Sequence, residues 1–146
     1  MNVEIKIDPS YKVPKVIVIT DKVTEEINVL VARLSEVTPR LIAGFRDNVL
    51  RILEQDEIIR VYANNGKIIA STDNGEFFIR QRLYEIEQLL DSSRFVRISN
   101  SEIINLRKVK GFDLSLAGTI CVSFTDSSVT YVSRRYVSKI KKILGV

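Results

Sequence analysis

The sequence contains no histidine, and this absence removes much of the usual chemistry of enzymes. Histidine is the side chain that exchanges protons near neutral pH, so general acid–base catalysis lacks its most common residue. Serine–histidine and cysteine–histidine nucleophilic pairs are excluded for the same reason. The chain also has no Walker A motif and no G-x-G-x-x-G after a strand. The sequence therefore predicts a protein that is not an enzyme.

A single cysteine, Cys121, restricts the chain further. It cannot form a disulfide within the chain, and a zinc site would need several Cys or His ligands. We interpret Cys121 as a small packing residue of a strand and expect no metal or cofactor. The carboxylates of Glu54, Asp56 and Glu57 precede a strand. A solvated turn explains them more simply than an acid/base pair does.

Long apolar runs are also missing. No segment is long and apolar enough to span a membrane, and the N-terminus lacks the basic and apolar regions of a signal peptide. A cytoplasmic protein is expected. Apolar residues make up 45% of the 146 residues, which is typical of a globular protein with one core or two small ones.

Basic charge is gathered in the last third of the chain. Residues 1–93 carry 12 Lys and Arg against 15 Asp and Glu, whereas residues 94–146 carry 10 against 3. The net charge of +4 therefore arises from a C-terminal part at +7 and a remainder at −3. This distribution favours a polyanion as partner, and an acidic protein surface is the alternative.

Hydrophobic periodicity predicts an α+β protein that is mainly antiparallel β with three helices. The Asn65-Gly66 and Asn74-Gly75 pairs indicate hairpin turns. Strands are expected near residues 2–8, 15–19, 41–45, 48–53, 58–63, 67–72, 76–80, 95–98, 108–114, 119–124 and 129–132. Helices are expected near residues 23–34, 83–90 and 133–144, the first capped by Thr20-Asp21, the last beginning at Ser133 and ending at Gly145.

Two parts of the chain are expected, with a boundary near residues 40–47. Residues 1–45 are predicted to form a small strand–strand–helix unit, and residues 46–146 the larger domain. No Gly/Ser-rich linker separates them, so we expect them to be packed together or continuous. The first unit is a candidate for self-association or a regulatory contact.

The stretch from Phe95 to Val109 is the most informative part of the sequence. A strand ends in Ser99-Asn100-Ser101, and Arg107, Lys108 and Lys110 close the stretch. Short polar side chains framed by basic residues can contact a phosphate backbone and reach base edges. An ordinary surface turn with solvated charges is the alternative.

Several residues in or beside basic turns can contact DNA. Asn100 carries the donor–acceptor pair that matches adenine in the major groove. Arg97 can reach a phosphate or pair with a carboxylate along the sheet. Arg134 and Arg135 open the last helix, where the helix dipole disfavours cations. An anionic partner explains them, and a structural ion pair is the alternative for Arg134. Tyr136 fits the core of its helix better than a stacking platform.

Three segments resemble one known family in order and spacing: RFVRISNSEIINLRKVKGF at 94–112, GTICVSF at 118–124 and TYVSRRYVSKIKKIL at 130–144. They are similar to the LytTR family of bacterial DNA-binding domains, over roughly residues 48–146. The resemblance implies an elongated fold of small antiparallel sheets with short helices. It also implies that loops, rather than a helix, enter successive major grooves and bend the duplex.

The resemblance places DNA contacts at three sites: the turn at Ser99 and Asn100, the start of the last helix at Arg135 with Arg134 beside it, and the first hairpin. Many members carry a basic or imidazole residue in that hairpin and a histidine in the turn. Gly66 and Ser99 stand there in this chain, so Lys67 or Asn65 would substitute in the hairpin. The candidate DNA-binding residues are therefore Arg97, Ser99, Asn100, Arg134, Arg135, Lys67, Asn65 and Lys108.

Residues 1–45 are too few for the receiver domain that most members carry. The chain is similar to the small stand-alone regulators of the family, which implies a membrane protein that restrains the regulator. We therefore expect a transcription regulator that binds double-stranded DNA at repeated promoter sites, as a homodimer. The alternative is a non-enzymatic adaptor whose basic surface binds an acidic protein. An RNA-binding domain would show an aromatic pair or a G-x-x-G loop, and neither is present.

Overall fold

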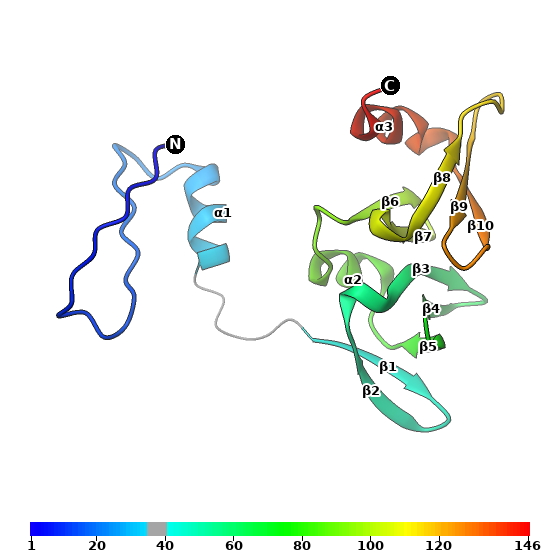
Figure 1. The fold of residues 1–146 in the computed structure, drawn as a ribbon, viewed down its shortest axis with the longest axis horizontal. Helices are drawn as coiled ribbons and strands as arrows, with labels where there is room; N and C mark the ends of the chain where they lie inside the picture. Colours follow the sequence, from blue (N-terminus) through cyan, green and yellow to red (C-terminus); the bar gives the residue numbers. More distant parts are fainter. Residues whose placement is uncertain (35–40) are drawn as a thin grey trace. The chain divides into compact units, whose positions relative to one another are not determined.

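The computed structural model describes residues 1–34 and 41–146, which belong to two separate units. The first unit contains one helix, α1 (Glu25–Leu34), shown in blue in Figure 1. Thr24 Oγ1 accepts a hydrogen bond from the backbone N–H of Ile27 at 3.3 Å. The helix is therefore capped by Thr24 and not by the Thr20-Asp21 pair expected from the sequence.

The two strands predicted at residues 2–8 and 15–19 are not formed, so the strand–strand–helix prediction is wrong in its strands. The alternating side chains of Val3, Ile5 and Ile7 are 87%, 84% and 88% exposed. Alternation makes a segment fit a sheet, but a strand needs a hydrogen-bonded neighbour and an apolar face to cover. Within residues 1–34 no other segment supplies either.

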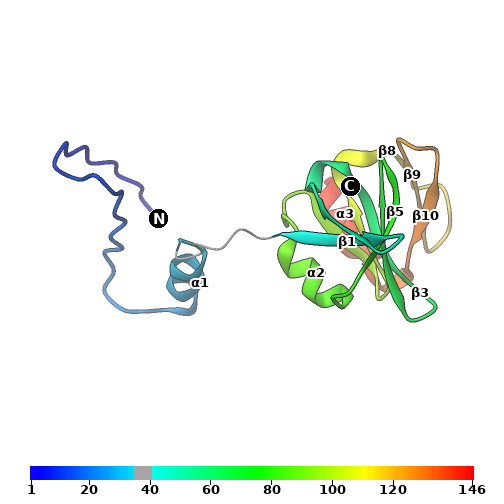
Figure 2. The same ribbon diagram turned by 90° about the horizontal axis from the view of Figure 1, so that it is seen from below.

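Residues 41–146 confirm the predicted fold class, because they form two antiparallel sheets with short helices (Figures 1 and 2). The seven-stranded sheet has the order β2-β1-β5-β4-β3-β7-β6. Its strands are β1 (Ile42–Arg46), β2 (Val49–Leu53), β3 (Ile58–Asn64), β4 (Lys67–Thr72), β5 (Gly75–Ile79), β6 (Phe95–Ser99) and β7 (Glu102–Asn105).

The second sheet has three strands in the order β10-β9-β8. They are β8 (Val109–Asp113), β9 (Ile120–Phe124) and β10 (Val129–Val132). The helices of this unit are α2 (Leu83–Leu89) and α3 (Arg134–Leu144), with 3-10 turns at η1 (Gln55–Glu57) and η2 (Leu106–Lys108). We expected residues 42–45 to belong to the N-terminal unit. They belong to the larger unit instead, because β1 pairs with both β2 and β5.

Two hydrophobic cores hold the larger unit together. The first lies between one face of the seven-stranded sheet and α2, and includes Val61, Phe77, Ile86 and Ile103. The second joins β3, β6 and β7 to the three-stranded sheet and to Ile140 of α3. Adjacent residues of one strand point to opposite faces, so the buried side chains of β3 divide between the two cores, with Ile58 in the first and Ile59 in the second. This sandwich fixes the position of α3 relative to the end of β6.

Strand β7 was not predicted as a strand, although all four of its residues are buried. In its sequence, Glu102 and Asn105 flank the apolar pair Ile103-Ile104, and polar residues at both ends are typical of a surface segment. The carboxylate of Glu102 is satisfied inside the protein by Arg60 Nη1 at 3.1 Å and by the Thr130 hydroxyl at 2.8 Å. Satisfied hydrogen bonds allow such a group to be buried at little cost, so Glu102 joins the two sheets.

Three polar turns of the larger unit are closed by the same local contact. In each, an aspartate accepts hydrogen bonds from the hydroxyl and the backbone N–H of the serine two residues later. The serine hydroxyl is the main cause that holds the pKa of Asp91, Asp113 and Asp126 below its ordinary value. These carboxylates are thus committed to their turns.

The acidic cluster before β3 is also structural. Glu57 pairs with Arg51 at 3.2 Å, and Asp56 pairs with Arg94, while Glu54 is exposed. Each paired carboxylate faces an arginine and not another acid. The arrangement fits a surface turn and offers no acid/base pair.

Candidate nucleic-acid interface

Three loops meet at one end of the seven-stranded sheet. The β3–β4 turn, the segment after β5 and the β6–β7 turn all lie there because neighbouring strands run antiparallel. The backbone N–H of Ala63 donates to the carbonyl of Ser101 at 2.8 Å and ties the first turn to the third. We call residues 65–67, 80–82 and 99–101 the loop end of the sheet.

Helix α3 begins beside the β6–β7 turn. The backbone N–H of Ser133 donates to the carbonyl of Ile98 at 3.0 Å, and the Tyr136 hydroxyl donates to Asn100 Oδ1 at 3.3 Å. Both contacts join segments more than thirty residues apart in the chain. The turn at Asn100 and the arginine pair that opens α3 therefore share one surface.

Arg97 holds the β6–β7 turn in shape. Its Nε donates to the carbonyl of Ser99 at 2.8 Å, one Nη donates to the carbonyl of Asn100 at 2.7 Å, and the other pairs with Glu87 at 2.6 Å. Of the two roles expected for Arg97, the structure shows the contact with a carboxylate. Ser99 closes the same turn, since its Oγ accepts a hydrogen bond from the backbone N–H of Ser101 at 3.1 Å. Arg97 and Ser99 thus position the turn.

Replacing Arg97 with alanine is expected to loosen the turn and, with it, the bond between Ala63 and Ser101. Hydrogen exchange at the Ala63 amide should become about tenfold faster, which corresponds to roughly 1.4 kcal/mol of local stability. Exchange measured by NMR checks this, and Arg107→Ala serves as the control. Arg107 is exposed in η2, at the opposite end of β7. Equal exchange in the two variants would contradict the role of Arg97.

Arg134 and Arg135 are both exposed, and neither forms an ion pair with any of the residues that the structure describes. The structural ion pair considered for Arg134 is therefore not observed within residues 1–34 and 41–146. Two unpaired cations at a helix N-terminus are unfavourable in isolation because the dipole repels them. Their position suits an anion supplied from outside the chain.

Tyr136 combines a packed ring with a polar tip. Its ring packs against the second core, as expected for a residue on the apolar face of α3. Lys139 Nζ lies 5.8 Å from the centre of the ring. The hydroxyl extends to Asn100, so Tyr136 orients the amide and does not offer a free stacking face. Asn100 itself remains exposed.

Asn65 and Lys67 lie exposed at the tip of the β3–β4 hairpin. The φ angles of Asn65 and Gly66 are 51° and 75°, as a two-residue type I′ turn requires, so Asn65 makes the turn. Lys67 Nζ lies 5.1 Å from the centre of the Phe78 ring. The predicted hairpin is therefore confirmed, and it presents Lys67 at the loop end.

Lys108 lies away from the other candidates. It belongs to η2, which follows the far end of β7, and its Nζ pairs with Asp73 of the β4–β5 turn at 2.7 Å. An antiparallel sheet places the β4–β5 turn opposite the β3–β4 turn. The proposed interface therefore does not include Lys108.

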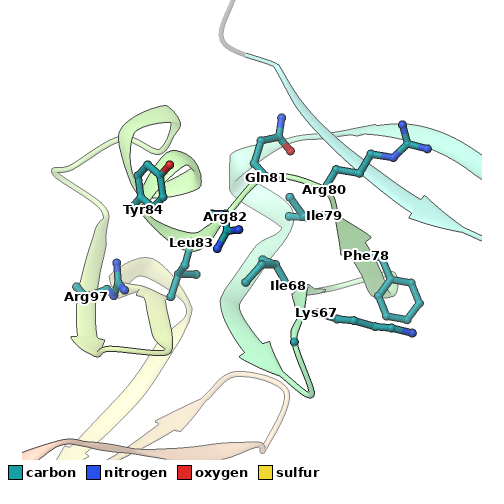
Figure 3. A pocket seen from close by; sticks show the side chains of 11 residues that line it. Lys67, Ile68, Phe78, Ile79, Arg80, Gln81, Arg82, Leu83, Tyr84 and Arg97 are labelled. Carbon is teal, nitrogen blue, oxygen red and sulfur yellow. The ribbon is translucent and has the colours of Figure 1, made fainter.

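Two basic residues of the loop end were not among those selected from the sequence. Arg80 and Arg82 follow β5 and line a hollow of about 670 Å³ together with Lys67 and Arg97 (Figure 3). The signal in the sequence was an arginine pair at a strand end, which is weak without knowledge of its neighbours. Only the sheet order brings it beside the hairpin and the turn.

A β-rich unit whose basic loops and helix start share one end has the features of a nucleic-acid-binding domain. Residues 48–145 match the family model described as the LytTr DNA-binding domain. The chain belongs to this family, as its sequence resemblance predicted.

Relatives and a solved structure agree with this assignment. An HTH-type transcriptional regulator of Staphylococcus aureus strain NCTC 8325 / PS 47 is 34% identical over 105 residues, covering 72% of this chain and 71% of the relative. The corresponding protein of strain MRSA252 is 33% identical over the same length. The LytTr DNA-binding domain of a Bacillus cereus response regulator has a TM-score of 0.70 at 21% identity, covering 73% of this chain and 97% of that one. The structural match shows the shared fold.

The helices of this chain do not form a helix-turn-helix pair in the described residues. Five strands separate α1 from α2, and five more separate α2 from α3. None of these helices, within residues 1–34 and 41–146, is long and apolar enough to cross a membrane. The loop end and the first turn of α3 are therefore considered as the candidate interface.

Proposed function

We propose that this chain is a transcription regulator that reads duplex DNA in the major groove with the loop end and the first turn of α3. The observation that carries the proposal is the hydrogen bond from Tyr136 to Asn100. It fixes an exposed amide, which can read a base, beside two arginines that have no partner among the described residues. Base-edge contacts and phosphate contacts then come from one surface.

Each residue has a distinct part in this mechanism. Asn100 keeps both Nδ2 donors and a second lone pair on Oδ1 while it accepts from Tyr136, so it can still pair with adenine. Arg134 and Arg135 are suited to bind phosphate or guanine through paired N–H donors. Lys67 supplies a further cation from the hairpin. Arg97 and Ser99 hold the turn without contacting DNA, and no step requires a cofactor.

Pairing of two copies on repeated promoter sites forms part of the proposal, as does a membrane protein that restrains the regulator. The support is the N-terminal unit, in which α1 buries no residue and many apolar side chains are exposed. Exposed apolar segments of this kind favour association with another chain. A duplex DNA partner implies that the protein acts in the cytoplasm.

Selection from a random duplex pool, followed by titration of the selected site with salt, tests the proposal. One sequence should be enriched, and the logarithm of the affinity should fall steeply with the logarithm of the salt concentration. Each phosphate contact contributes about 0.9 to that slope, so contacts from Arg134, Arg135 and Lys67 predict a slope of about −3 or steeper. A flat response without enrichment would contradict DNA binding. Retention of an acidic protein from nuclease-treated lysate would then favour the adaptor.

A further inference from the structure

The hollow beside the β3–β4 hairpin is lined by four basic residues and no acidic one. Lys67 comes from the start of β4, Arg80 and Arg82 from the segment after β5, and Arg97 from β6 (Figure 3). It therefore lies on the loop end and shares Arg97 with the turn that carries Asn100. The second hollow of the same unit is different, because Glu54 and Asp56 line it with Arg94.

Three of these cations are not neutralised by the described part of the chain. Arg97 uses its donors on Glu87 and the turn, but Lys67, Arg80 and Arg82 form no ion pair with any residue in 1–34 or 41–146. In Figure 3 the side chains of Lys67 and Arg80 extend away from those of Arg82 and Arg97. The three unpaired cations therefore border the hollow from two sides and are available to an external anion.

Two of the cations are held in place by aromatic rings. The Arg80 guanidinium lies 4.4 Å from the centre of the Phe45 ring, and Lys67 lies 5.1 Å from that of Phe78. Phe45 and Phe78 are paired across β1 and β5, so both rings stand on the same face of the sheet. Cation–π contacts restrict the side chains before a ligand arrives and reduce the entropy lost on binding.

Arg82 occupies the N-cap position of α2, where an arginine side chain does not stabilise the helix. It precedes α2 at the N-cap position, which favours Ser, Thr, Asp or Asn, whereas a guanidinium has no acceptor with which to cap. Its backbone serves the helix: the N–H donates to the Glu85 carboxylate at 3.2 Å, and the carbonyl accepts from the N–H groups of Glu85 and Ile86 at 3.0 and 3.1 Å. The guanidinium side chain therefore gives the helix no benefit that explains it.

We propose that Lys67, Arg80 and Arg82 form a phosphate-binding extension of the DNA interface. This inference rests on the proposed function, because it assigns a further contact to the same duplex. Duplex DNA is the occupant that the observations favour, since the hollow is basic and lies at the end of the sheet that carries Asn100. A duplex bound to the β6–β7 turn and to α3 would extend over this hollow, so that its backbone phosphates lie near the three cations. Contacts here add affinity without reading bases.

The test compares the full chain with an Arg80→Gln/Arg82→Gln variant on the selected site. Binding is measured against salt on a long duplex and on duplexes shortened from either flank. The variant should bind about tenfold more weakly near 150 mM salt, with its salt slope reduced by about 2, since each lost phosphate contact removes roughly 0.9. Its sequence preference should stay unchanged. On the duplex shortened at the flank that meets the hollow, parent and variant should bind equally.

Arg107→Gln is the matched control, because it removes one exposed arginine at the far end of β7. Equal melting temperatures of the variants and the parent show that the variants are folded. If the double variant does not fold, the single variant Arg82→Gln replaces it in the same measurements. An unchanged slope in the Arg80/Arg82 variant, or a deficit that persists on every shortened duplex, would overturn the extension. If the parent selects no DNA sequence, the proposed function fails, and this outcome is distinct from failure of the extension.

Discussion

A variant carrying Asn100→Ala and Arg135→Ala is expected to bind the selected DNA site about a hundredfold more weakly than the parent. Each substitution removes one contact to the duplex, and such contacts contribute about 1–3 kcal/mol each. A combined loss of about 3 kcal/mol corresponds to roughly 150-fold in affinity. Electrophoretic mobility shift or fluorescence anisotropy at fixed salt measures the effect.

The single variants separate the two roles. Asn100→Ala should relax the sequence preference at one base pair, because the amide is proposed to read a base. Arg135→Ala should weaken binding at least as much as Asn100→Ala does. Neither side chain is buried, so both variants should melt within a few degrees of the parent. Parent-like affinity in both single variants would remove these residues from the interface.

Replacing Asn105 with alanine is expected to lower the free energy of unfolding by about 3 kcal/mol. Asn105 is 1% exposed, its Nδ2 donates to the carbonyl of Ile58 at 2.8 Å, and its Oδ1 accepts from the backbone N–H of Arg107 at 3.0 Å. The substitution leaves the Ile58 carbonyl without a partner in the protein interior and removes the cap of η2. Urea denaturation followed by circular dichroism checks the expected value.

Asn105→Asp distinguishes the lost hydrogen bond from the lost volume. The aspartate has nearly the same shape and still accepts from Arg107, but it cannot donate to Ile58 and places a negative charge against the carbonyl. We expect it to be at least as unstable as Asn105→Ala. Parent-like stability of the aspartate variant would show that the donor to Ile58 contributes little. Asn100→Ala, in an exposed amide five positions away, is the matched control.

The two asparagines illustrate how far residue type and spacing determine a role. Asn100 and Asn105 lie in the same stretch, and both belong to the segment that resembles the family. Asn100 lies on the surface beside α3, whereas Asn105 is buried in the sheet. Their different roles follow from this difference in burial. The roles of Arg97 and Lys108 were likewise decided by tertiary contacts. Each pairs with a carboxylate, Glu87 or Asp73, that is not its neighbour in the sequence.

Local patterns determined the sequence of elements in residues 41–146. Alternation predicted most strands, Asn65-Gly66 predicted the β3–β4 hairpin, and the apolar stripe from Tyr136 to Leu144 predicted the last helix. That helix ends at Gly145, which has a φ angle of 75°. These signals act within a few residues, through backbone conformation and the period of side-chain directions. The same local signal was wrong at residues 2–8 and 15–19, where no neighbouring strand is available within residues 1–34.

The sequence by itself determined the fold class, the family and the basic character of the last third. The tertiary structure decided which basic residues act together. Strand order brings residues 65–67, 80–82 and 99–101 to one end of the sheet, and the second core places the start of α3 beside them. Such proximity depends on hydrogen bonds and packing between segments far apart in the chain, which no local pattern records.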